Sequence, residues 1–149
     1  MPKWYQICSM RKDINFSPVK DVHVVVGKDD EGWKVFLINR TKDKLENVMV
    51  TSRGYGETKT EKQETSTLRH MIPFVDPREY ALIEPIDESV FHLNNEYWVS
   101  YFIDGQVYDK KFIFVPDSIV EENLIFIEEL EMKGILHDWN TWSNRLKFA

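Results

Sequence analysis

Four histidines and one cysteine are the side chains of this sequence best suited to metal binding or nucleophilic catalysis. His23, His70, His92 and His137 lie singly along the chain, without the i, i+4 or paired-cysteine spacing that preorganises a metal site. Cys8 lies in a poorly patterned N-terminal segment, and no G-x-S-x-G nucleophile turn is present. We therefore expect no metal ion, no cofactor and no catalytic residue, and we regard an enzyme as the less favoured interpretation.

The candidate binding residues of the first half of the chain flank one polar loop, residues 53–64. Arg53 and Tyr55 begin this loop, and Arg69 and His70 follow it. If the two flanking strands pair, these side chains cluster at one end of the fold, where loops commonly bind ligands or partners. The Arg-Gly-Tyr-Gly segment lacks both phosphate-loop spacings, so we interpret it as a turn.

The aromatic residues of the second half of the chain need a cover. The hairpin predicted over residues 96–115 has aromatic side chains on both alternating faces, and only one face can form the core. Uncovered apolar faces usually mark association sites. Coverage by the aromatic tail, which contains Trp139 and Trp142, is favoured, and coverage by another subunit is the alternative. Both tryptophans are therefore candidate partner-binding residues.

Short apolar runs separated by turn residues predict an all-β, mainly antiparallel protein. Because the runs have no βαβ rhythm, we expect an immunoglobulin-like sandwich of about seven strands. The Asp104-Gly105 dipeptide predicts a two-residue turn between the last two of these apolar runs. The seven runs are Val22–Val26, Trp33–Asn39, Asn47–Ser52, Thr65–Ile72, Tyr80–Ile86, Glu96–Ile103 and Gln106–Val115.

The segment 118–133 has conflicting signals. Ser118 and Glu121 have the spacing of a capping box, and Lys133-Gly134 resembles a helix end, so we expect a helix there. The continuous apolar run 124–127 contains two β-branched residues, and an eighth strand or an irregular segment is the alternative.

Size and charge limit the functional class. The chain has 149 residues, and 19 basic against 25 acidic side chains give a net charge of −6, which argues against binding nucleic acid. One cysteine excludes an intrachain disulfide, and no signal-peptide or membrane-spanning pattern is present, so we expect a cytoplasmic protein. We divide the chain into an N-terminal extension (1–20), a single β-sandwich-like domain (21–136) and an aromatic C-terminal tail (137–149).

Several segments resemble a small bacterial family whose members are commonly labelled phenylalanyl-tRNA synthetase subunit alpha. The resemblance runs from about Met10 to Leu136 and implies no active site, because the shared segments have no chemistry attached. This acidic chain is also too short for a synthetase core that binds ATP, an amino acid and a tRNA end. The segments are Arg11-Lys12-Asp13-Ile14, Val19–Val24, Ser66–His70, Phe91–Glu96 and Lys111–Phe114.

These observations favour a non-catalytic, cytoplasmic protein-interaction module. Its partner is expected to be a protein, either a second copy or another chain, bound through a sheet face, the 53–64 loop or the tail. The alternative is a small-ligand-binding protein or a small enzyme with a site near Tyr55, Arg69 and His70.

Overall fold

The protein consists of strands and two short 3-10 turns over residues 17–57 and 59–137, the part of the chain that the computed structural model describes. The all-β prediction is confirmed, with ten strands rather than about seven. The three additional strands, β4, β9 and β10, are short. The elements are β1 Val22–Asp29, β2 Gly32–Asn39, β3 Leu45–Glu57, β4 Lys62–Glu64, β5 Leu68–Val75, β6 Tyr80–Ile86, η1 Glu88–Val90, β7 Asn94–Ile103, β8 Gln106–Phe114, η2 Glu121–Asn123, β9 Ile125–Ile127 and β10 Met132–Leu136.

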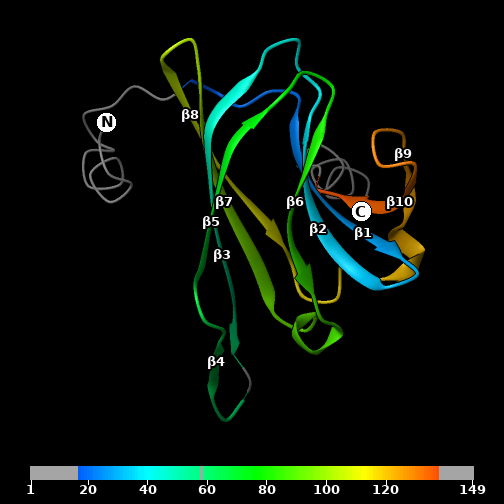
Figure 1. Ribbon diagram of the computed structural model, residues 1–149. Coiled ribbons are helices and arrows are strands. Elements are labelled where there is room, and N and C mark those ends of the chain that lie inside the picture. The colour runs from blue at the N-terminus through cyan, green and yellow to red at the C-terminus, as the bar shows by residue number, and fades with distance from the viewer. Residues whose placement is uncertain (1–16, 58, 138–149) are drawn as a thin grey trace, which may run out of the picture.

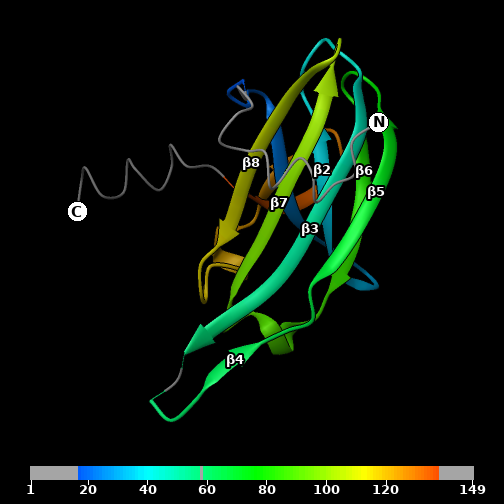
Figure 2. The same cartoon turned by 90° about the vertical axis from the view of Figure 1, so that its left-hand side faces the viewer.

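The strands form two antiparallel five-stranded sheets that pack face to face as a β-sandwich (Figure 1). The β1 sheet has the order β6-β2-β1-β10-β9. The β3 sheet has the order β4-β3-β7-β8, and β5 pairs with β3 on the same side as β4. Figure 2 shows β8, β7, β3 and β5 side by side in this second layer.

Alternation along the strands produces the core between the sheets. Every second residue of β1 and β2 lies in one core cluster with every second residue of β3 and β7. These residues are Val22, Val24 and Val26, Trp33, Val35 and Leu37, Val48 and Val50, and Tyr97, Val99 and Tyr101. The largest buried side chains of this core include Tyr101 (1% exposed) and Phe112 (0% exposed). Near η1, Phe91 packs edge-on against Trp33 of β2 with ring centroids 5.4 Å apart.

The Asp104-Gly105 turn forms as predicted between β7 and β8. Asp104 has φ 48° and Gly105 has φ 78°, and positive φ at both central residues is what a type I′ turn requires. The ladder is regular up to the turn, since Ile103 pairs with Gln106.

The predicted helix within 118–133 is wrong. That segment forms the 3-10 turn η2, the strand β9 and the beginning of β10, and β9 pairs antiparallel with β10. Gly134 is a strand residue that faces β1, and a Cβ there would lie 2.7 Å from Cγ1 of Val25. The glycine is therefore required by close packing and does not end a helix, and the β-branched Ile125 and Ile127 belong to a strand.

The segment after η2 also builds a second, smaller core on the outer face of the β1 sheet. Ile127 (0% exposed) and Leu130 (7% exposed) pack there against Val25, Phe36 and Ile38. Apolar residues that alternation directs away from the main core are covered in this way by the chain itself.

Candidate functional site

The two sheets end next to each other along one side of the sandwich. Among residues 17–57 and 59–137, β5 pairs only with β3, and β6 pairs only with β2, so each is the last described strand on this side of its sheet. A short connection, residues 76–79, joins the two strands. We call β5, β6 and this connection the open edge (Figures 1 and 2). Terminal strands leave a row of backbone donors and acceptors available to an added strand.

Large apolar side chains are exposed along the open edge. Of the eight such side chains in the described part of the chain, five lie on β5 and β6. Two of the five contact another side chain. Lys44 Nζ lies 4.3 Å from the Phe74 ring centroid, and Tyr80 packs edge-on against Phe36. The five are Leu68 (47% exposed), Met71 (62%), Phe74 (51%), Tyr80 (46%) and Leu82 (51%).

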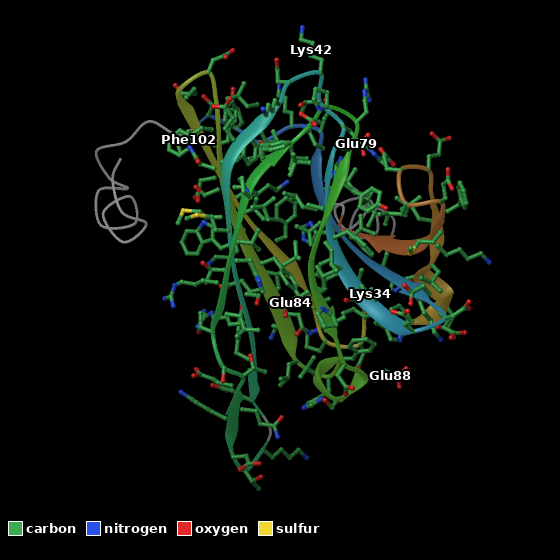
Figure 3. The ribbon with its side chains drawn as sticks, in the orientation of Figure 1. Lys34, Lys42, Glu79, Glu84, Glu88 and Phe102 are labelled. Carbon is green, nitrogen blue, oxygen red and sulfur yellow. The ribbon has the colours of Figure 1, made fainter. Side chains whose placement is uncertain are left out.

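A cleft of about 230 Å³ opens between the beginning of β5 and the end of β6. Its walls come from β3, from the first part of β7, from the segment that leads into β5, and from the end of β6 with the residues that follow it. Figure 3 shows Glu84 in the space between the two layers. The lining residues that matter for its chemistry are Ser52, Thr65, Glu84, Asp87, Asn95 and Tyr97.

Glu84 connects the two sheets within the cleft. Its Oε1 accepts a hydrogen bond from Ser52 Oγ at 2.5 Å and contacts His70 Nε2 at 3.0 Å. Ser52 and His70 lie on β3 and β5, and Glu84 lies on β6. Because both contacts use Oε1, the second oxygen remains available as an acceptor. The Glu84 side chain is 15% exposed.

This cluster does not have the arrangement of a hydrolytic triad. In a triad, the imidazole lies between the nucleophile and the carboxylate, so that it can take the proton of the nucleophile. Here the carboxylate lies between Ser52 and His70. The Ser52 hydroxyl donates to a carboxylate, and the residue is only 5% exposed. The arrangement therefore suits binding better than covalent catalysis.

Two neighbours set the electrostatics of the cleft. Tyr97 is 2% exposed, and burial, together with the Glu84 charge, raises the pKa of its phenol, which therefore stays neutral. Asp87 accepts a hydrogen bond from the Ser89 amide at 2.8 Å, and this bond lowers the pKa of the Asp87 carboxyl. The Asp87 carboxyl lies in the lining together with that of Glu84.

Arg53 is turned to the opposite face of the β3 sheet. Its Nε lies 3.1 Å from Oε2 of the buried Glu96, and its guanidinium lies 4.7 Å from the Tyr55 ring centroid. The Glu96 carboxylate raises the pKa of Arg53. Lys111 Nζ lies 3.7 Å from the other Glu96 oxygen and 5.0 Å from the Trp98 ring centroid. These cations serve a buried carboxylate on the outer face, and their charge is not directed into the cleft.

The structure separates the candidate residues predicted from the sequence. Arg53 and Tyr55 contact each other on the outer face. Arg69 is exposed opposite Thr51, and strand alternation places it on that same face. His70 turns the other way, toward Glu84. The remaining candidates, Trp139 and Trp142, lie outside the described residues.

Sequence reasoning missed Ser52 and Glu84. A signal for Glu84 was present, because it is the single charged residue of an otherwise apolar strand, YALIEPI. A charge in such a run needs a polar partner in the folded state. The partner itself could not be read from the sequence, because Ser52 and Glu84 are 32 residues apart and lie on different sheets.

No family model matches the sequence, and no curated protein matches it significantly. Within residues 17–57 and 59–137, no group of three histidine, cysteine or acidic side chains could hold a metal ion. The same part of the chain contains no helix long and apolar enough to span a membrane.

Proposed function

We propose that this protein is a non-catalytic interaction module that binds an extended segment of a partner protein along the open edge. In such recognition, the backbone of the terminal strand supplies hydrogen bonds to the added strand, and nearby pockets select its side chains. One observation supports this proposal above the others: terminal strands of both sheets lie next to each other, and they bear five of the eight large exposed apolar side chains of the described residues.

The composition of β5 supports the same proposal. Exposed terminal strands are normally protected by charges, prolines or bulges. β5 has Pro73 and Arg69, but three of its eight residues are large, apolar and about half exposed or more. An added strand would bury these side chains and would extend the sandwich across the cleft.

We also propose that the sandwich is of the immunoglobulin-like type. The order β1, β2, β6 matches strands A, B and E, and the order β3, β7, β8 matches strands C, F and G. β9 and β10 extend the β1 sheet beyond that plan. The resemblance to the bacterial family and the cytoplasmic location stay predictions from the sequence.

A small-ligand-binding protein or small enzyme at Tyr55, Arg69 and His70 has less support. Sites for drug-sized ligands typically have volumes of roughly 300–1,000 Å³, and the cleft has about 230 Å³. Tyr55 and Arg69 lie on the face opposite His70. The three side chains therefore do not line one cavity.

A selection from a phage library of random linear peptides tests the proposed function. We expect enriched peptides to slow amide hydrogen exchange in β5 or β6. The variant Met71→Lys, which puts a charge on the open edge, should weaken binding by about tenfold or more. Val115→Lys is the matched control, since Val115 is also apolar and 43% exposed but lies after β8. Protection that maps to β9 or to η2, with Met71→Lys binding normally, would contradict the proposal.

A further inference from the structure

The cleft beside the open edge is the second feature that a bound segment would meet. Its lining includes Leu68 at the start of β5 and Glu84, Pro85 and Ile86 at the end of β6. A strand that pairs along the open edge passes its mouth, and alternate side chains of that strand point toward the sandwich. The volume of about 230 Å³ is below the range typical of free small ligands and suits a single side chain.

The charge of the cleft selects the class of side chain. The lining contains two carboxylates, those of Glu84 and Asp87, and one cation, Arg53. The Arg53 guanidinium is engaged by Glu96 on the other face of the β3 sheet. The Tyr97 hydroxyl is neutral, and Ser52 already donates to Glu84. Among the lining residues the cleft therefore offers acceptor oxygens and negative charge, and the basic group that contacts Glu84, the imidazole of His70, lies beside its Oε1.

Glu84 is the group best placed to receive a donor. Its carboxylate is mostly buried and is held from two sides by Ser52 and His70. Both contacts go to Oε1, so Oε2 can accept from an ammonium or guanidinium without breaking either of them. A charge-assisted hydrogen bond to such a mostly buried carboxylate contributes more than a neutral bond.

We propose, resting on the proposed function, that the cleft binds one lysine or arginine side chain of the extended segment, with Glu84 as the carboxylate that receives its charge. The open edge then provides the affinity through backbone pairing and apolar contacts. Glu84 provides the selectivity and fixes the register of the bound segment, because only one position of the segment can enter the cleft.

The test uses the same random-peptide selection on the full chain. We expect the peptides enriched on the native protein to have a basic residue at one fixed position relative to their apolar positions. Glu84→Gln keeps an oxygen that can accept from Ser52 and His70 but removes the charge, and it should weaken those peptides by about tenfold. Glu122→Gln is the matched control, because it removes the same charge from an exposed residue of η2, away from the open edge.

A change on the peptide side keeps the test independent of the stability of the variant. Replacing the basic residue of an enriched peptide by norleucine should cost about the same tenfold on the native protein. Enriched peptides without a fixed basic position, or with affinity unchanged by Glu84→Gln and by norleucine, would overturn this inference and leave the open-edge function standing. A selection that enriches no peptide would overturn both.

Discussion

The two sides of the sandwich are finished in different ways. On the side of β8 and β10, the chain itself closes the gap: Ile119 is 3% exposed, and the His137 ring packs edge-on against Phe112 and Phe114 at 5.2 and 5.6 Å. On the side of β5 and β6, large apolar residues remain about half exposed. We call the first the closed side.

The two sides differ in how far the chain itself covers their apolar residues. Apolar residues occur on both sides, and within the described residues a later segment, 115–137, returns over those of the closed side, although its own Ile125 and Phe126 stay 52% and 63% exposed. Burial of apolar area stabilises by roughly 25 cal/mol per Å². The apolar side chains of the open edge are still about half exposed, so a segment that covered them would gain this stabilisation. Three experiments test how the two sides differ.

The largest difference is expected between Phe112→Ala and Phe74→Ala. Phe112 is 0% exposed in the main core, whereas Phe74 is 51% exposed on β5. Phe112→Ala should lower the free energy of unfolding by about 3–5 kcal/mol, and Phe74→Ala should change it by about 0.5 kcal/mol or less. Urea denaturation measures both. Similar losses in the two variants would mean that the open edge is as well packed as the closed side.

A smaller loss in the free energy of unfolding is expected from Asn39→Ala, because the Asn39 side chain is hydrogen-bonded to the backbone of the open edge. Asn39 is fully buried, and its amide donates to the backbone oxygens of Asp43, Val75 and Asp76. Two of these acceptors belong to the end of β5 and its connection to β6. Leaving them unpaired should cost about 1–3 kcal/mol.

The location of that loss distinguishes the two sides. In Asn39→Ala, amide hydrogen exchange should accelerate in β5 and β6 before it accelerates in β8 and β10. Uniform acceleration over both sides would show that the amide stabilises the whole sandwich and not the open edge.

The smallest effect concerns the ion pair between Arg40, which follows β2, and Glu129, which lies between β9 and β10. Arg40 Nε lies 2.6 Å from Glu129 Oε2, and this hydrogen bond lowers the pKa of the Glu129 carboxyl in the folded state. A depressed folded-state pKa contributes stability above the unfolded pKa, and this contribution is lost as the pH falls through the folded value. Between pH 7 and pH 3, the native protein should therefore lose up to about 1 kcal/mol more than Glu129→Gln.

Thermal unfolding at several pH values measures that difference. Glu128→Gln is the control, because it removes a neighbouring charge from an exposed residue. An equal pH dependence of the native protein and Glu129→Gln would show that the pair with Arg40 contributes nothing to folding.

The strands were predictable from the sequence because each of the seven long ones has the alternation or the β-branched composition that a sheet favours. The Asp104-Gly105 turn was predictable because its conformation depends on two adjacent residues. The segment 118–133 was not, because local capping signals were outweighed by the pairing of β9 with β10 and of β10 with β1. Tertiary pairing of this kind leaves little trace in local sequence.

The candidate site was less predictable for a similar reason. His70 was identified, but its partner Glu84 comes from the other sheet. Adjacent strand residues point to opposite faces, and this separates His70 from Arg69 although the two are neighbours in sequence. The sequence therefore identified the region of the chain but not which of its side chains share a cavity.

The pairing of β3 limits how far the open edge can assemble. β4 pairs with the end of β3 as a narrow ribbon, and β5 pairs with the rest of β3 along the same side, with residues 65–67 between them outside any strand. A continuous template for added strands therefore extends no further than the eight residues of β5. Long, unbroken edges allow chains to stack into fibrils. A short, interrupted edge such as this one gives little room for open-ended stacking of that kind.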